Sequence, residues 1–170
     1  KNPIDFAYDD NIDLVIELIG GEDGIAKELS YACVKNSKPF VTANKALIAK
    51  HGFKLSQIAK QKKVFFGFEA AVAGCIPVIK VIKESLISNK IQQITGILNG
   101  TCNYLLDEIE KKSLEFSIAL KEAQKLGYAE SDPTFDIEGI DAAHKIIILS
   151  SLVFGEMPNL KKLYVKGISE

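Results

Sequence analysis

The sequence predicts an α/β protein in which the end of a doubly wound parallel sheet is followed by an α+β segment. Apolar runs of strand length alternate with stretches whose apolar residues recur at helical spacing. Strand, helix and strand follow one another within about 30 residues, the size of a βαβ unit. The pattern of residue types changes near residues 69–77, where Gly74 and Pro77 interrupt a run of small residues. We therefore expect one domain over residues 1–70 and a second over residues 71–170.

The first domain is predicted to contain three strands with helices between them. The apolar run Leu14–Ile19 ends in Gly20-Gly21, and acidic residues follow where a helix N-terminus favours them. The expected elements are strands at 14–19, 39–42 and 64–68, a helix at 25–33, a helix at 45–50 that stops near Gly52, and a short helix at 55–59.

The second domain is predicted to be mostly helical. Gly127 follows an amphipathic stretch and is a strong signal for a helix C-terminus. The expected elements are a helix from Pro77 to Leu86, a strand at 91–98, a helix opened by Asn99, a helix at 116–126, a polar loop at 128–136, a long helix at 139–154 and the start of a strand at 163–165.

Composition and charge exclude several classes of function. The net charge is -1 and all 21 basic residues are lysines, which argues against nucleic-acid binding because phosphate clamping favours arginine. No apolar run reaches the roughly 18 residues of a membrane span. The three cysteines lack metal-site spacing, so we expect them to be buried thiols of a cytoplasmic protein. The chain begins with Lys1, so we expect a segment of a longer protein.

Two strand ends form a candidate cofactor site. Gly20 and Gly21 follow the first predicted strand, and Lys45 follows the second. Open parallel sheets bind ligands at the carboxyl ends of their strands, and glycines let a ligand approach the backbone. A plain turn and a solvated lysine remain the alternatives. The chain contains no GxGxxG motif, so a dinucleotide's phosphate-binding turn would lie upstream.

A cluster of acids and a lysine is the strongest local signal. Glu130, Asp132 and Asp136 lie in a polar loop, and Asp141 and Lys145 share one face of the helix that follows. A lysine so placed can donate a proton to a carbonyl oxygen during aldehyde reduction. The alternative is an exposed ion pair of little energetic value. The neighbouring His144 points about 100° away on the helix and is expected to be structural.

Four blocks of sequence, in order and with plausible spacing, resemble the homoserine dehydrogenase family over about residues 12–155. They are LIGG at 18–21, VTANKAL at 41–47, FEAAVAGCIPVI at 68–79 together with ILNGTCNYL at 97–105, and GYAESDPTFDIEGIDAAHK at 127–145. The resemblance implies the tail of a Rossmann-type NAD(P)-binding domain followed by a domain for substrate binding and dimerisation. The implied reaction interconverts L-homoserine and L-aspartate 4-semialdehyde, within threonine, methionine and isoleucine biosynthesis.

The resemblance also implies roles for individual residues. Lys145 is similar to the proton-donating lysine of the family, and Lys45 to the lysine near the nicotinamide and the substrate. Glu130 matches the acid that binds the substrate amino group. Asp141 matches the aspartate that orients substrate and lysine, and Asp136 falls at another acidic position of the substrate site.

A loop between the two domains resembles the family's monovalent cation site, usually occupied by sodium. The positions whose backbone carbonyls would hold the cation are Glu69, Val72, Gly74 and Ile76. The chain departs from the family at Cys75, where glycine is common, and at Cys102, where threonine is common. Both side chains are small, so carbonyl binding is expected to survive.

The resemblance implies NADP or NAD as cofactor, a small-molecule substrate and a homodimer, with no membrane partner. Two alternatives remain. Another amino-acid oxidoreductase with a Rossmann domain would share the cofactor side but take a different substrate. A non-catalytic fragment or assembly module would fit the missing dinucleotide motif.

Overall fold

The computed structural model describes residues 2–158 and 162–169. The chain forms two compact units, which are described separately. Residues 1–92 with 147–158 form the first, called the sheet unit below. Residues 93–146 with 159–170 form the second, called the cluster unit.

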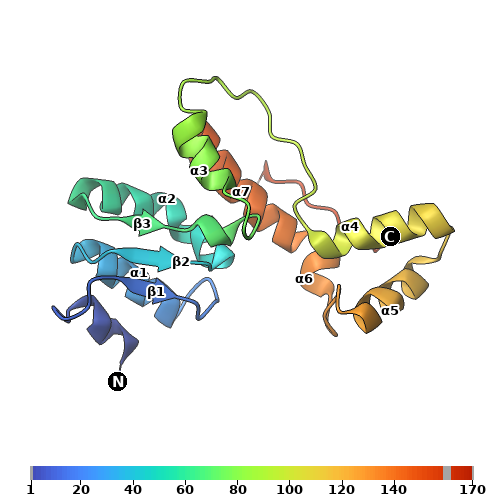
Figure 1. Ribbon diagram of the computed structural model, residues 1–170, viewed down its shortest axis with the longest axis horizontal. Helices are drawn as coiled ribbons and strands as arrows, with labels where there is room; N and C mark the ends of the chain where they lie inside the picture. Colours follow the sequence, from blue (N-terminus) through green and yellow to red (C-terminus); the bar gives the residue numbers. More distant parts are fainter. Residues whose placement is uncertain (1, 159–161, 170) are drawn as a thin grey trace. The chain divides into compact units, whose positions relative to one another are not determined.

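The sheet unit is built on three parallel strands in the order β1-β2-β3 (Figure 1). The strands are β1 (Val15–Glu17), β2 (Phe40–Thr42) and β3 (Phe66–Gly67). Phe40 stands opposite Val15 on one side and opposite Phe66 on the other. The predicted α/β class with a parallel sheet is confirmed, and the strands are shorter than expected.

Two helices pack against each other beside the sheet, α1 (Ile25–Lys35) and α2 (Lys45–Lys62). A short 3-10 helix, η1 (Pro3–Ala7), precedes β1. Phe40, Leu47 and Leu55 are completely buried between these elements. Removing each large apolar side chain from water contributes roughly 1.5–3 kcal/mol, so this core fixes how helices and strands pack.

The prediction that a helix stops near Gly52 was wrong, because α2 runs without interruption from Lys45 to Lys62. Gly52 lies buried in its middle, on the face that also buries Ile48, Leu55 and Ala59. A glycine inside a helix costs about 1 kcal/mol. Burial of the apolar face exceeds that cost, and tertiary packing supplies most of a helix's stability.

The segment after β3 is less regular than predicted. It contains a 3-10 turn, η2 (Glu69–Ala71), a short helix, α3 (Val78–Lys80), and a π-helical turn, η3 (Val81–Ser85). The carboxylate of Glu69 accepts hydrogen bonds from the backbone N–H groups of Ile79, at 2.9 Å, and Lys80, at 3.0 Å. Since α3 and η3 follow each other without a break, the helix expected from Pro77 to Leu86 is present over Val78–Ser85, with a π-helical second half.

The cluster unit contains α4 (Gly100–Lys112), α5 (Phe116–Leu126), α6 (Thr134–Ile137) and the first turns of α7 (Ile140–Phe154) (Figure 1). Residues 147–154 of α7 belong to the sheet unit. Leu105 of α4 packs with Ala119 and Ala123 of α5 in a small core. Gly127 ends α5 with a φ of 80°, which confirms the predicted helix stop.

Four further predictions were wrong. Residues 91–98 and 163–165 form no strand, because no neighbouring strand among the described residues pairs with their backbones. The polar loop at 128–136 contains the start of α6. Cys75 is exposed rather than buried, although all three cysteines are free as expected.

Candidate active site

Lys145 and Asp141 form a largely buried ion pair at the beginning of α7. The Nζ atom of Lys145 lies 2.6 Å from Oδ2 of Asp141, and the two side chains are 18% and 2% exposed. The alternative of a solvated surface pair is therefore wrong. A charge removed from water must be paired and hydrogen-bonded, so the surroundings of this pair decide whether it is tolerated.

The chain segment at residues 98–99 supplies those surroundings. The ammonium group of Lys145 also donates to the backbone carbonyl of Leu98, at 2.7 Å. The side-chain amide of Asn99 donates to Oδ2 of Asp141, at 2.8 Å, and to Oδ1 of Asp136, at 2.7 Å. Of the predicted site residues, the structure thus brings Asp136, Asp141 and Lys145 into one network.

The beginning of α4 holds this network in place. Asn99 is the N-cap of α4, and its Oδ1 accepts from the backbone N–H of Cys102 at 2.8 Å. The hydroxyl of Thr101 lies 3.1 Å from the second carboxylate oxygen of Asp136. Burial, followed by the nearby charges of Asp136 and Asp141, raises the pKa of the Cys102 thiol. The thiol therefore stays protonated at neutral pH and acts as a neutral neighbour.

Glu130 and Asp132 are not part of the network. Glu130 is exposed, and its carboxylate makes no hydrogen bond or ion pair among residues 2–158 and 162–169. Only its backbone carbonyl is held, by the amide of Gln124 at 3.0 Å. Asp132 instead accepts hydrogen bonds from the hydroxyl and the backbone N–H of Thr134, the first residue of α6, and these bonds lower the pKa of the Asp132 carboxyl.

The carboxyl ends of β1 and β2 carry a second network, centred on Glu17. This glutamate is 1% exposed. One carboxylate oxygen accepts from the backbone N–H groups of Ile19, at 2.6 Å, and Gly20, at 3.0 Å. The other accepts from the hydroxyl of Thr42, at 2.5 Å. Neutral donors thus satisfy a buried carboxylate and fix the backbone that follows β1.

The predicted cofactor residues lie around this network. Gly20 and Gly21 have φ angles of 86° and 83°, which favour glycine, and the carbonyl of Gly21 accepts from the Asn44 amide at 2.6 Å. Asn44 caps α2 through the N–H of Leu47, and Lys45 is the first, half-buried residue of that helix. A Cβ atom added at Gly20 would meet open space.

The predicted cation loop is compact and irregular. Val72 is buried, Gly74 has a φ of 57° and Ile76 is exposed. The carbonyl of Glu69 accepts from the N–H of Val72, and that of Ile76 from the N–H of Val78. Each carbonyl oxygen has a second lone pair, so these bonds leave capacity for a cation. No cluster of three acidic, histidine or cysteine side chains suited to a metal occurs in the described part of the chain.

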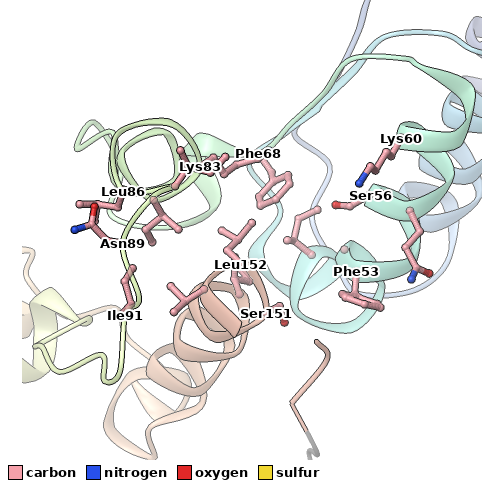
Figure 2. Close-up of a pocket in the computed structure, with 17 residues that line it drawn as sticks. Phe53, Ser56, Lys60, Phe68, Lys83, Leu86, Asn89, Ile91, Ser151 and Leu152 are labelled. Atoms are coloured by element: carbon pink, nitrogen blue, oxygen red, sulfur yellow. The ribbon is translucent and has the colours of Figure 1, made fainter. Parts of the chain in front are cut away.

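The sheet unit also has an apolar pocket of about 480 Å³ (Figure 2). It is lined by α2, by the segment after α3 and by the end of α7, with Phe53, Phe68 and Leu152 among its apolar side chains. None of the predicted catalytic, cofactor or cation residues lines it. The pocket therefore offers mainly apolar surface, with Lys60 and Lys83 as the charged side chains of its lining.

The sequence alone predicts neither Asn99 nor Glu17 as a site residue. It predicts Asn99 only as the opening of a helix and Glu17 only as part of an apolar strand. A signal existed for Glu17, because a lone acid inside a buried strand needs donors nearby. Asn99 carried no comparable signal, because its partners lie 37 and 42 residues further along the chain.

No helix in the described part of the chain is long and apolar enough to cross a membrane. A protein-family model described as homoserine dehydrogenase matches residues 77–170 of the chain.

Known proteins resemble the chain over almost its whole length. A homoserine dehydrogenase of Neisseria gonorrhoeae is 49% identical over 100% of the chain, and one of Pseudomonas aeruginosa is 53% identical over 98%. A crystal structure of a homoserine dehydrogenase from Thiobacillus denitrificans has a TM-score of 0.91 and 51% identity over 99% of the chain.

An archaeal homoserine dehydrogenase solved in complex with NADPH has a TM-score of 0.89 and 28% identity. It is matched over 100% of the chain and 52% of its own length. The chain spans 39% of the Neisseria protein, 38% of the Pseudomonas protein and 39% of the Thiobacillus structure. It is therefore similar to a part of these proteins.

Proposed function

The chain belongs to the homoserine dehydrogenase family, and we propose that it carries the proton-transfer and substrate-binding residues of an NAD(P)-dependent homoserine dehydrogenase. The proposed reaction interconverts L-homoserine and L-aspartate 4-semialdehyde. The observation that supports it most directly is the buried pair of Lys145 and Asp141, held at 2.6 Å.

The pair supports a role for Lys145 as general acid and base. An ammonium group has three N–H donors, and Lys145 directs two of them to Asp141 and to the carbonyl of Leu98. We propose that the third reaches the carbonyl oxygen of the semialdehyde and gives it a proton during reduction. In the oxidation of homoserine, Lys145 takes that proton back. Asp141 orients the lysine and balances its charge.

Glu130 and Asp136 are proposed to bind the substrate. Glu130 is exposed and acidic, so its carboxylate is available to the substrate ammonium group. Asp136 is half-buried and held by Asn99 and Thr101. A site that presents these two carboxylates to the substrate would favour a cationic amino group over a neutral or anionic one.

Gly20, Gly21 and Lys45 are proposed to contact the nicotinamide cofactor. The archaeal relative solved with NADPH supports a cofactor of this class. The open space beside Gly20 and the fixed backbone after β1 fit close approach by a flat ring. When bound, the cofactor supplies or accepts the hydride, while the chain's own residues position it and exclude water.

The loop containing Glu69, Val72, Gly74 and Ile76 is proposed to hold a monovalent cation through backbone carbonyls, with sodium as the proposed ion. The sequence-based division into domains at residues 1–70 and 71–170 is likewise proposed, as are a homodimer and a cytoplasmic location. Spare lone pairs on the carbonyls and the positive φ of Gly74 support the cation site.

The test is turnover by the full-length protein that contains this chain. We expect homoserine-dependent reduction of NADP or NAD, and we expect Lys145→Ala to lower kcat by about 10² or more, the scale of general acid–base catalysis. Affinity for NADPH, measured by fluorescence titration, should change little, because the lysine acts on the substrate.

Lys111→Ala is the matched control. Lys111 also pairs with an aspartate four residues away, Asp107 at 2.8 Å, but its side chain is 68% exposed. Its replacement should leave kcat unchanged. Wild-type turnover in Lys145→Ala would contradict the assigned proton donor, and activity only with other oxo acids would contradict the substrate.

A further inference from the structure

We infer that Asn99 is a positioning residue that holds Asp136 and Asp141 together and thereby sets the Lys145 ammonium group for proton transfer. Neither the sequence nor the resemblance assigned it that role. The inference rests on the proposed function, because the proton transfer that it serves is the one proposed for Lys145.

Every polar atom of the Asn99 side chain is used. Its amide nitrogen carries two hydrogens, one directed to Asp136 at 2.7 Å and one to Asp141 at 2.8 Å. Its amide oxygen accepts from the N–H of Cys102 at 2.8 Å. Asn99 is 8% exposed, so water does not easily replace these partners. One residue thus joins the beginning of α4 to α6 and α7.

The adjacent residue acts on the other member of the ion pair. The carbonyl of Leu98 accepts from Lys145 at 2.7 Å, while the amide of Asn99 donates to the Asp141 oxygen that Lys145 also contacts. Consecutive positions of one segment therefore fix both the lysine and the aspartate. The N-cap hydrogen bond between Asn99 and the N–H of Cys102 holds residues 98–99 at the start of α4. The helix therefore fixes the segment that orients the pair of Lys145 and Asp141.

No common substitute fulfils all these requirements. Aspartate and serine are good N-caps and would preserve the bond to Cys102. Aspartate, however, has no donor and would add a third carboxylate beside Asp136 and Asp141. Serine has a shorter side chain with a single O–H donor, in place of the two N–H donors of the asparagine amide. The two substitutions therefore separate the capping role of Asn99 from its bridging role.

The charges around this position come from three helices. Asp136 lies on α6, Asp141 and Lys145 lie on α7, and the neutral thiol of Cys102 lies on α4. Asp141 Oδ2 contacts both the Asn99 amide, at 2.8 Å, and the Lys145 ammonium, at 2.6 Å. A carboxylate at position 99 would thus lie within the roughly 4–6 Å over which an opposite charge stabilises an ammonium ion.

The experiment compares Asn99→Ser and Asn99→Asp in the full-length protein. One measurement is the pH dependence of kcat with homoserine. The other is the pH dependence of acetylation of Lys145 by acetic anhydride, followed by mass spectrometry, which needs no substrate or cofactor. Acetylation reports the neutral amine, so its midpoint moves when the ammonium form is stabilised.

Asn99→Asp should move the acetylation midpoint of Lys145 and the rising limb of the kcat profile to higher pH, by roughly one unit. Asn99→Ser should lower kcat by about tenfold without an upward shift, because the carboxylates lose their donors but no charge is added. Affinity for NADPH should stay unchanged in both. A residue that only stabilises the helix would not produce different pH profiles in two variants that both retain a good cap.

Asn2→Asp is the matched control, because Asn2 is also an N-cap, whose side chain accepts from the N–H of Ile4. It should leave both pH profiles unchanged. Wild-type kcat and wild-type acetylation in both Asn99 variants would overturn the inference, as would an equal effect of Asn2→Asp. If the wild-type protein does not oxidise homoserine, the proposed function fails, and acetylation of Lys145 alone then decides the positioning role.

Discussion

Each of the two networks of the chain satisfies a buried carboxylate, but the hydrogen-bond donors differ between them. In the sheet unit, Glu17 is 1% exposed and its partners are two backbone N–H groups and the hydroxyl of Thr42. In the cluster unit, Asp141 is 1% exposed and its partners are the ammonium of Lys145 and the amide of Asn99. Each network also contains an asparagine that caps a helix, Asn44 in the first and Asn99 in the second.

The difference lies in what the partners of each carboxylate can do. Backbone N–H groups and a hydroxyl cannot exchange a proton usefully near neutral pH, so the network of Glu17 fixes the shape of a turn. A lysine can give up and regain a proton, so the network of Asp141 can take part in chemistry. We infer that the first network shapes a cradle for a cofactor and the second moves a proton.

The largest loss of stability should follow removal of the Asp141 carboxylate, which pairs with the charged Lys145. Asp141→Ala leaves the 18% exposed Lys145 without its carboxylate, and breaking a buried pair costs about 3 kcal/mol of unfolding free energy. Urea unfolding measures this loss. Asp107→Ala is the control, because it breaks an exposed pair with Lys111 and should cost far less. Equal losses in the two variants would show that burial of the Lys145 pair has no energetic consequence.

A smaller loss of stability should follow removal of the Glu17 carboxylate, whose partners are all neutral donors. Glu17→Ala removes the carboxylate that accepts from the N–H groups of Ile19 and Gly20, and a typical hydrogen bond contributes about 0.5–1.5 kcal/mol. Hydrogen exchange of these two amides should accelerate, and affinity for NADPH should fall. Glu17→Gln keeps an oxygen acceptor and should lose less. If exchange at both amides stayed slow in Glu17→Ala, the carboxylate would not be what fixes the turn.

The smallest effect should come from an exposed carboxylate beside the same turn. Hydrogen bonds from Lys50 and then Lys27 lower the pKa of Asp23 below its ordinary value of 3.8. Because the folded-state pKa is depressed, Asp23 stabilises the protein above pH 3.8, and this contribution is lost as the pH falls below that value.

Thermal unfolding of Asp23→Asn should therefore show a slightly lower Tm than wild type at neutral pH and no difference in strong acid. The carboxylate is exposed, so water and salt weaken its ion pairs. Added salt should remove most of the neutral-pH difference. A Tm difference that grew on acidification would have the wrong sign for a depressed pKa.

The fold was predictable wherever local pattern and burial agree. The strand ending before Gly20, the helix from Phe116 to Leu126 and its stop at Gly127 all follow from apolar spacing and backbone conformation. Prediction failed at Gly52, because burial of one face of α2 outweighs the local preference of glycine. It also failed at residues 91–98, because a strand needs a partner that local sequence does not supply.

The sequence by itself determined that Asp141 and Lys145 share one face of a helix, because their spacing of four residues is a property of helix geometry. It also determined the family, through four ordered blocks of residues. Only the tertiary structure decided that this pair is buried, that Asn99 binds both Asp141 and Asp136, and that the carbonyl of Leu98 holds the lysine. These contacts join residues tens of positions apart, and burial and long-range hydrogen bonding depend on packing that no local pattern contains.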